Sequence, residues 1–167
     1  MALITEDRKL TGLDLIETVQ SNVTMASLGK VSSNGILSRK LEADVSREYV
    51  KKLNIKTPGI KTIVGNLSGG NQQKVVIAKW LMTEADIIIM DEPTRGIDVG
   101  AKRDIYLLIG EFVKEGKAVI VISSEIPEII GLSDRVMVMA EGRCTGVLNR
   151  DEFDQEKIMT FATDFGA

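Results

Sequence analysis

The sequence predicts an α/β fold in which a helical subdomain packs beside an incomplete, mainly parallel sheet. Apolar residues in the first half of the chain recur at helical spacing. Residues 86–122 instead hold two continuous apolar runs of strand length with a helical pattern between them, which is typical of a β-α-β unit. Only about two parallel strands are visible, and a stable parallel sheet normally has more. We therefore expect further strands upstream of Met1.

Three helices are predicted in the first half, after residues 2–5, which have the character of a strand's last residues. The polar stretch 31–38 separates the first two helices, Pro58 and Gly59 interrupt the pattern, and Ser68-Gly69-Gly70 opens the third. The apolar faces comprise Ile16, Val19, Val23 and Ala26, then Leu41, Val45, Tyr49 and Leu53, then Val75, Ala78 and Met82.

The second half is predicted as strands and helices in alternation. Residues 86–90 and 118–122 form buried parallel strands, and a helix from about Gly100 crosses between them. A short helix follows Pro127, and a turn at Glu141-Gly142 joins strands over 135–139 and 144–148, with Cys144 packed in or near a strand. A polar helix from Asp151 closes the chain.

Composition excludes several classes of function. The 21 basic residues against 24 acidic ones leave a net charge of -3, so the chain lacks the cationic field of a nucleic-acid-binding protein. One cysteine and no histidine exclude disulfide frameworks, Cys/His zinc sites and histidine-dependent triads. No secretory signal opens the chain and no apolar run approaches the roughly 20 residues of a membrane-spanning helix, which predicts a soluble cytoplasmic protein.

Two adjacent acids, Asp91 and Glu92, directly follow the first predicted strand of the β-α-β unit. Ligands of open α/β sheets bind at the carboxyl ends of strands. There the first carboxylate is suited to hydrated Mg²⁺ and the second to orienting or deprotonating a water aimed at a phosphate. Acids that merely end a strand are an equally weighted alternative.

Two further segments carry less specific patterns. In Leu67-Ser68-Gly69-Gly70, the glycines allow close backbone approach and a helix starts at once, which suits a phosphate, although an isolated Ser-Gly-Gly is more often a plain helix cap. In the loop 93–98, Asp98 is placed to cap the next helix and Arg95 to stay exposed.

Together and in this order, the three segments resemble the ATP-binding-cassette (ABC) ATPases: the signature motif at 67–73, Walker B at 87–92 and the D-loop at 96–98. The wording of 67–75, 91–102 and 123–129 is more narrowly similar to the second cassette of bacterial monosaccharide importers of the ribose, galactose and xylose type. Glu6-Asp7-Arg8-Lys9 resembles the Q-loop of that cassette, and the match runs almost to the C-terminus.

The resemblance implies a partial P-loop NTPase fold in three segments. These are a Q-loop-like segment (1–13), the helical subdomain with the signature motif (14–85) and the C-terminal part of the ATPase core (86–167). By motif, Asp91 supports Mg²⁺, Glu92 is the catalytic base, and Ser124, at the switch-loop position, is the second catalytic residue. The nucleotide-binding residues implied are Ser68, Gly69 and Gly70, which face the γ-phosphate held by the opposing cassette, together with Gln72, Asp98 and Glu6.

Three features depart from the family pattern. Glu6 stands where most cassettes have a glutamine, and Ser124 stands where most have a histidine, which a serine cannot replace as a cationic or imidazole donor. The P-loop pattern G-x-x-x-x-G-K-[ST] is absent, since Gly29-Lys30 and Gly116-Lys117 are followed by Val31 and Ala118. Without that loop the β- and γ-phosphates have no cradle.

The resemblance therefore implies part of the energy-coupling subunit of a sugar importer, peripheral on the inner face of the membrane. Its partners would be the missing N-terminal cassette portion, a transmembrane permease and, indirectly, a periplasmic sugar-binding protein. ATP and Mg²⁺ would bind only in the complete cassette dimer, and this chain alone would hydrolyse almost no ATP. The alternative is a stand-alone, non-catalytic remnant that docks on a cassette or permease.

Overall fold

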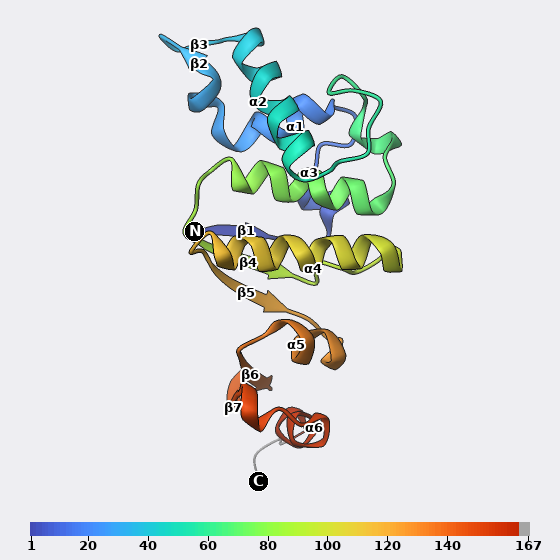
Figure 1. Ribbon diagram of the computed structural model, residues 1–167, viewed down its shortest axis with the longest axis vertical. Helices are drawn as coiled ribbons and strands as arrows, with labels where there is room; N and C mark the ends of the chain where they lie inside the picture. The colour runs from blue at the N-terminus through green and yellow to red at the C-terminus, as the bar shows by residue number, and fades with distance from the viewer. Residues whose placement is uncertain (164–167) are drawn as a thin grey trace. The chain divides into compact units, whose positions relative to one another are not determined.

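A computed structural model of the chain describes residues 1–163 (Figure 1). The chain folds as two compact units, Met1–Ile122 and a second that begins at Ser123. The first unit contains a sheet, helices on that sheet and a helical region. The predicted division at residues 13 and 85 follows motifs rather than compactness and stays a prediction.

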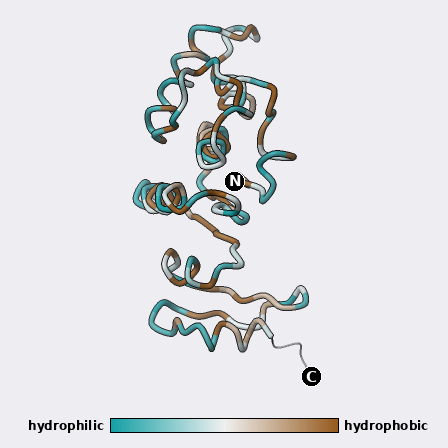
Figure 2. Tube along the Cα trace, turned by 90° about the vertical axis from the view of Figure 1, so that its right-hand side faces the viewer, coloured by the Kyte–Doolittle hydropathy of each residue, from teal (hydrophilic) through white to brown (hydrophobic). Residues whose placement is uncertain are grey.

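The sheet of the first unit has three parallel strands in the order β1-β4-β5. They are β1 (Ala2–Ile4), β4 (Ile87–Asp91) and β5 (Ala118–Ile122). The tube of Figure 2 is hydrophobic along β5, as expected of such a strand. The predicted α/β class with an incomplete parallel sheet is confirmed, and residues 2–5 supply the third strand.

One face of this sheet is covered and the other is not. Helices α3 (Gly69–Leu81) and α4 (Val99–Lys114) contact β1 and β5, and the side chains of Ile4, Ile88 and Met90 are buried. Across the opposite face, Ile120 remains 51% and Ile122 49% exposed. The prediction of strands buried on both faces was therefore wrong for β5, because these residues supply only one covering layer of helices.

The helical region contains α1 (Val19–Thr24) and α2 (Arg39–Lys52), with short helices η1 (Arg8–Gly12), η2 (Met25–Val31) and η3 (Val64–Asn66). The first predicted helix begins later than its apolar pattern indicated, because the Thr18 side chain caps α1 and Ile16 lies before it, 81% exposed. The polar stretch 31–38 forms a hairpin of β2 (Ser32–Ser33) and β3 (Ile36–Leu37), which sequence analysis missed.

The buried face of α2 agrees only in part with the predicted one: Leu53 is buried and Val45 and Tyr49 are half-buried, but the first turn differs. Leu41 is 40% exposed, whereas Glu42 is buried. The Glu42 carboxylate accepts hydrogen bonds from Gln20 Nε2 at 2.6 Å and Thr24 Oγ1 at 3.1 Å. Paired burial of polar groups from α1 and α2 thus replaces the apolar pattern in the first turn of α2, because a buried carboxylate needs donors that only α1 supplies.

The second unit packs helices on a hairpin. It contains α5 (Ile126–Leu132), β6 (Arg135–Ala140), β7 (Arg143–Asn149), η4 (Arg150–Glu152) and α6 (Gln155–Ala162). Strands β6 and β7 are antiparallel, and the core is formed by Val136, Val138, Leu148 and Ile158. Cys144 lies in β7 but is exposed, and the closing helix starts at Gln155 because η4 occupies the residues before it.

Candidate functional site

The acids predicted for catalysis lie at one edge of the three-stranded sheet. In the parallel register Met90 pairs with Ile4 and Asp91 pairs with Ile122, so the carboxyl ends of all three strands meet there. Asp91 is the last residue of β4 and half-buried, and Glu6 follows β1 by two residues. The edge therefore carries acids from two neighbouring strands, as expected of a ligand site in an open sheet.

Glu92 adopts a backbone conformation that its residue type disfavours. Its φ is +46°, in the left-handed region, and its N–H donates to Ile122 O at 2.8 Å. The Glu92 carbonyl in turn accepts from the Arg95 N–H at 3.1 Å. A non-glycine residue held there costs on the order of 1 kcal/mol, and such residues cluster at functional sites. Glu84 at +58° and Glu141 at +48° share this conformation, so it describes the turn after β4 and does not by itself assign a function to the carboxylate.

The first turn of α3 presents N–H groups that have no hydrogen-bond acceptor among residues 1–163. Ser68 is the N-cap residue, but its side chain makes no capping hydrogen bond. Instead Ser68 Oγ accepts from Asn71 Nδ2 at 2.9 Å, which leaves the hydroxyl proton free to point elsewhere. The first N–H bonded within the helix is that of Gln72, to Ser68 O at 2.9 Å. Free N–H groups at a helix start are suited to an anion, and the nucleotide contact of Ser68, Gly69 and Gly70 stays a prediction.

The loop between β4 and α4 lies against that turn. Asp98 caps α4 as predicted, accepting from the Ala101 N–H at 2.9 Å. A Cβ placed on Gly69 would be 3.2 Å from Gly96 O. The two helix starts are therefore packed together in the first unit, with the 95–98 turn beside the glycines.

Arg8 joins this cluster, although sequence analysis assigned it no role. Its guanidinium donates to Arg95 O at 2.9 Å and Gly96 O at 3.2 Å. Arg95 is exposed as predicted, and its side chain forms an ion pair with Glu6. The only sequence indication was that Arg8 stands inside the Q-loop-like segment, because nothing local predicts a contact across 87 residues.

Two predicted residues lie differently. Gln72 is buried, and its Nε2 donates to the carbonyls of Val64 and Gly65 at 3.3 and 3.4 Å, so this amide bonds within the fold. Ser124 belongs to the second unit, exposed in the bend before α5, where Ser123 Oγ and Glu128 share a hydrogen bond. The nucleotide contact of Gln72 and the catalytic role of Ser124 stay predictions.

An ion pair joins α3 and α4 next to this site. Lys74 Nζ, on a side chain only 4% exposed, contacts Asp104 Oδ2 at 2.7 Å and Asn54 O at 3.1 Å. The hydrogen bond from Lys74 holds the pKa of the Asp104 carboxyl below its ordinary value. The pair ties α3 to α4 one to two turns below their packed N-termini.

The carboxylates at this edge of the sheet fit a Mg²⁺ ion that takes most of its ligands from water and phosphate. Among residues 1–163, no group of three or more Cys, Asp or Glu side chains is arranged to hold a metal ion. Mg²⁺ is commonly bound by one or two carboxylates while water and substrate phosphates supply the other oxygens. Asp91, as a half-buried carboxylate at the strand end, suits that mode of binding, and a cage of protein ligands is absent from the described residues.

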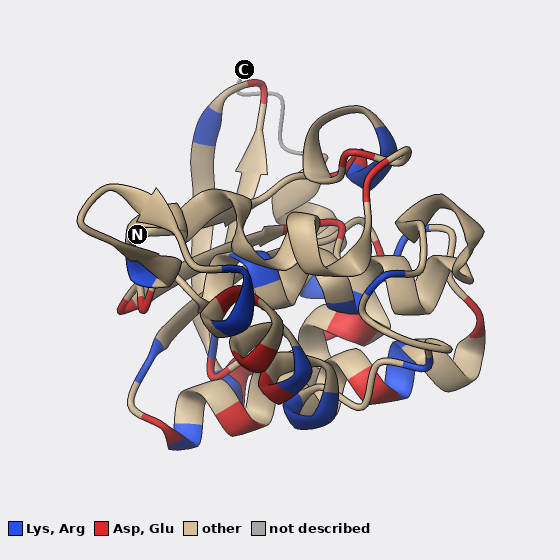
Figure 3. Cartoon of the chain, turned by 90° about the horizontal axis from the view of Figure 1, so that it is seen from above, with Lys and Arg blue, Asp and Glu red and all other residues tan. Residues whose placement is uncertain are grey.

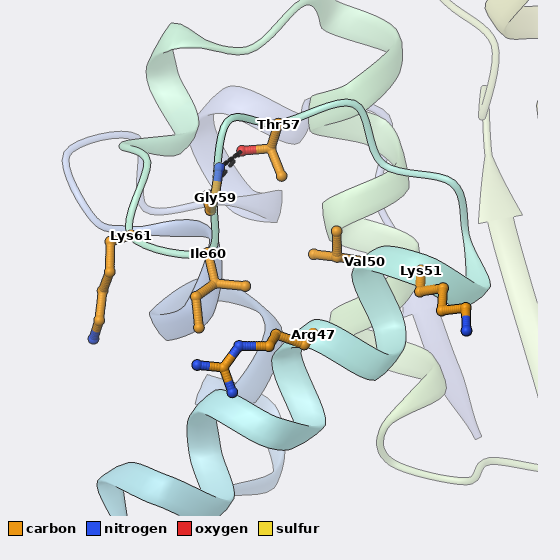
Figure 4. Close-up of a pocket in the computed structure, with 7 residues that line it drawn as sticks. All are labelled: Arg47, Val50, Lys51, Thr57, Gly59, Ile60 and Lys61. Atoms are coloured by element: carbon orange, nitrogen blue, oxygen red, sulfur yellow. Dashed lines mark hydrogen bonds between the residues drawn. The ribbon is translucent and has the colours of Figure 1, made fainter.

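Two surface cavities lie apart from these residues. One of about 460 Å³ lies between α2 and the 57–61 loop, where Val50 and Ile60 face the space below Gly59 (Figure 4). Another of about 570 Å³ is lined by the start of α6. None of the predicted site residues lines either cavity. Neither of these two cavities therefore belongs to the candidate site.

Charge is distributed without a basic face along the helices, where basic and acidic residues alternate (Figure 3). Such mixing gives no stripe of cations to follow a nucleic-acid backbone. Within residues 1–163, no helix combines the length and apolar character needed to cross a membrane.

Relatives of known class were found by sequence. The family described as ABC transporter has a model that matches residues 4–95, more than half of the chain. A putative ribose/galactose/methyl galactoside import ATP-binding protein of Rhizobium etli is 53% identical over 163 residues, which are 98% of this chain and 31% of that protein. The ribose import ATP-binding protein RbsA of Clostridium perfringens is 53% identical over 160 residues, 95% of this chain and 32% of that protein. This chain thus spans about a third of the length of these curated relatives.

Solved structures share the fold. An ATP-binding cassette, solved as a dimer in a post-hydrolysis state with ADP and Pi, matches with a TM-score of 0.73 at 24% identity, covering 91% of this chain and 64% of that one. A putative metal-chelate type ABC transporter in an inward-facing conformation matches with a TM-score of 0.79 at 17% identity, covering 96% and 62%. The predicted cassette fold, present in part, is confirmed.

Proposed function

This chain belongs to the ABC transporter family, and from that premise we propose that it is part of the ATP-binding subunit of a sugar importer. In that subunit, ATP binding and hydrolysis drive monosaccharide uptake through a membrane permease. The names of the relatives support this assignment, since proteins 53% identical over nearly the whole chain are described as ribose or galactose import ATP-binding proteins. The permease, a periplasmic sugar-binding protein and a position on the inner face of the membrane belong to the same proposal.

The observation that carries the proposal is the start of α3. Its first N–H groups have no acceptor in the part of the chain that the structure describes, and the Ser68 hydroxyl accepts from Asn71 rather than capping the helix. Free N–H groups at the positive end of a helix favour a phosphate. We assign Ser68, Gly69 and Gly70 to the terminal phosphate of a nucleotide held on a facing cassette.

The acids at the sheet edge have separate tasks in this proposal. Asp91 supports the Mg²⁺ that accompanies the nucleotide and neutralises phosphate charge when bound. Glu92 orients a water and accepts its proton, a task that suits a carboxylate placed directly after the end of β4. Asp98 holds the 95–98 turn at the start of α4, where it links the paired sites, and Ser124 acts from the switch region.

Glu6 is the residue whose predicted role changes most. Its carboxylate is engaged by the Arg95 side chain, so we assign it to the nucleotide site through the 95–98 turn rather than as a direct ligand. Gln72 likewise supports the site from inside, through its bonds to the carbonyls of the preceding turn. Both assignments follow from what the side chains already contact.

The exposed face of the sheet supports the expectation of a missing cassette portion. Leu3, Ile87 and Ile120 are 46%, 41% and 51% exposed on one side of adjacent strands. Parallel sheets are normally covered on both faces. We propose that the segment bearing the P-loop covers this face in the full-length protein, and that this chain alone hydrolyses almost no ATP because no cradle holds the phosphates.

A chimera tests the function. The corresponding third of the Clostridium perfringens ribose import protein is replaced by this chain, and ATP hydrolysis and ribose uptake are measured with its permease. We expect both activities in the chimera. Loss of hydrolysis on Glu92→Gln or Ser68→Ala is expected too, while Ser38→Ala, which removes the cap of α2 far from the acids, serves as the matched control.

Two results would contradict the proposal. A folded chimera with no nucleotide-dependent activity would remove this chain from catalysis and favour the non-catalytic docking remnant. Equal hydrolysis by the chimera and its Glu92→Gln variant would remove the general-base role from that residue. Rapid Mg²⁺-dependent turnover by the isolated chain would contradict the need for a phosphate cradle supplied from outside it.

A further inference from the structure

The guanidinium of Arg8 connects two loops that are far apart in sequence. Arg8 begins η1, just after the first strand of the sheet. Its Nη1 donates to Arg95 O at 2.9 Å and its Nη2 to Gly96 O at 3.2 Å. Both acceptors belong to the turn that follows the catalytic acids. A planar, permanently charged fork suits two adjacent carbonyls better than a single ammonium group does.

An ion pair also joins the Q-loop-like segment to the 95–98 turn, and in this case the turn provides the cation. The Arg95 side chain forms an ion pair with Glu6, two residues before Arg8. Each segment thus contributes one arginine to the other. The ion pair is exposed and adds little by itself, whereas the bonds from Arg8 are made to backbone atoms and fix the course of the turn.

Arg8 also touches the start of α3. A Cβ placed on Gly69 would lie 2.8 Å from Arg8 Nη2, closer than real Cβ atoms come. The guanidinium therefore lies between the first glycine of the signature motif and the 95–98 turn. Arg8 Nε is buried without a hydrogen-bond partner, so holding the side chain in this position has a desolvation cost.

The position of Arg8 beside the N-terminus of α3 is electrostatically unfavourable for that helix. A cation beside the N-terminus of a helix is unfavourable, because that end carries the positive pole of the macrodipole. A helix cap would select an acid or a hydroxyl there. The guanidinium donates to two carbonyls of the turn, so its location makes physical sense as a link between the turn and the helix.

We propose that Arg8 is a positioning residue that holds the 95–98 turn against the first turn of α3, and that Gly69 is a glycine partly to admit it. The linkage keeps Asp98 and the free N–H groups of α3 in one arrangement. Its consequence for ATP hydrolysis rests on the proposed function, but the linkage itself does not. A change at the Q-loop-like segment would reach the 95–98 turn through this side chain.

Hydrogen exchange of this chain tests the linkage without nucleotide. The reporter is the Arg95 amide, which is bonded to Glu92 O. In Arg8→Ala we expect this amide to exchange about tenfold faster or more, because the charge-assisted bonds from Arg8 to the carbonyls of Arg95 and Gly96, which hold the turn closed, are lost. Arg8→Lys is expected to give a smaller increase. The exposed Arg39→Ala is the matched control and leaves the rate unchanged.

A reference amide separates local opening from unfolding. Asn22, bonded to Thr18 O in α1, should exchange at the same rate in all variants. If Arg8→Ala increases the exchange rates of the Arg95 and Asn22 amides alike, that variant has unfolded globally. The exchange rate of the Arg95 amide in Arg8→Lys is then the test of the linkage. An unchanged Arg95 amide in a folded Arg8→Lys and a folded Arg8→Ala would overturn the proposal.

A double-mutant cycle tests the contact with Gly69. We expect Gly69→Ala to lower the melting temperature of the wild-type chain by several degrees, and by less than half as much in the Arg8→Ala background, because the methyl group then occupies vacated space. Equal shifts in the two backgrounds would show that Arg8 does not restrict this position. The Gly96 carbonyl, 3.2 Å from the added methyl, accounts for a residual shift.

The sugar-transport chimera then separates the two proposals. If Arg8 forms the linkage and the proposed function is correct, we expect Arg8→Ala to lower kcat for ATP hydrolysis with little change in KM, since the proposal gives Arg8 a positioning role and no contact with the nucleotide. A chimera inactive in every form, with the exchange result obtained as expected, contradicts the proposed function and leaves the linkage standing. An active chimera unaffected by Arg8→Ala overturns the part of the inference that concerns hydrolysis.

Discussion

Gly70 and Ala101 meet where the first turns of α3 and α4 pack together: a Cβ placed on Gly70 would lie 2.4 Å from Ala101 Cβ. The contact explains why the second glycine of the motif cannot carry a side chain, independently of any ligand. It also explains how the signature turn and the 95–98 turn are held at one edge of the sheet. Packing alone therefore requires glycine at this position.

The first prediction follows from that contact. Gly70→Ala should destabilise the chain by about 1–3 kcal/mol, because the added methyl overpacks a closed interface. Ala101→Gly in the same chain should recover most of the loss. Urea unfolding measures both, and Gly110→Ala is the control.

The control variant Gly110→Ala is expected to change the free energy of unfolding in the opposite direction. Gly110 lies in α4 with nothing within 4 Å of a Cβ built on it, so alanine there should stabilise by about 0.5–1 kcal/mol. If Gly70→Ala were as harmless as Gly110→Ala, the close contact between the two helix starts would be disproved.

The second prediction concerns the carboxylate of Glu92. Glu92→Gly should stabilise the folded chain by roughly 1 kcal/mol, because glycine adopts a φ of +46° without strain. The same change should abolish hydrolysis in the sugar-transport chimera. Glu141→Gly, at a φ of +48° in the β6–β7 turn, should stabilise similarly while hydrolysis persists.

Thermal unfolding and ATPase assays on the two variants measure this trade-off between stability and activity. Glu92→Gly that retains full hydrolysis would remove the general-base assignment. A loss of stability in both variants would mean that the left-handed conformation is favoured by these glutamates.

The third prediction is a pH dependence of the Lys74–Asp104 pair. The folded-state pKa of Asp104 lies below its unfolded value, so the pair's contribution is complete above about pH 4 and is lost as the pH falls further. Asp104→Asn should cost about 1 kcal/mol at pH 7 and at pH 5. The estimate is low because the carboxylate is 45% exposed.

Urea unfolding at pH 7, 5 and 3 measures the difference between the two chains, which should shrink at pH 3. Glu84→Gln is a useful comparison, since Glu84 pairs with Lys30 on the surface and that salt bridge is expected to matter less. A cost that persists unchanged at pH 3 would assign the Asp104 effect to packing.

The fourth prediction concerns the second unit. A Cβ on Gly146 would lie 2.6 Å from the Phe161 ring, so Gly146→Ala should displace α6 from the hairpin and cost about 1–3 kcal/mol. Phe161→Leu should relieve part of that loss. Phenylalanine-dependent near-ultraviolet circular dichroism and urea unfolding follow the change, and unaltered stability of Gly146→Ala would refute the tight contact.

Much of the fold could be predicted because the patterns were local. Residues 87–90 and 118–122, which make up nearly all of β4 and β5, are continuous apolar runs, and the helix between them begins beside the predicted cap Asp98. The hairpin at residues 32–37 was missed, although Asn34-Gly35, both at positive φ, is a turn signal that sequence analysis overlooked. The face of α2 was misjudged in its first turn because Glu42 is buried by donors from another helix.

The sequence by itself determined the fold class, the family resemblance and the acids at the strand end, because these depend on residue order and short-range periodicity. Only the tertiary structure decided that Ser68 leaves its helix uncapped, that Gln72 turns inward and that Arg8 reaches the 95–98 turn. Those outcomes depend on which hydrogen-bond partners the fold brings within about 3 Å. Residues 87 positions apart have no shared periodicity from which such a contact could be predicted.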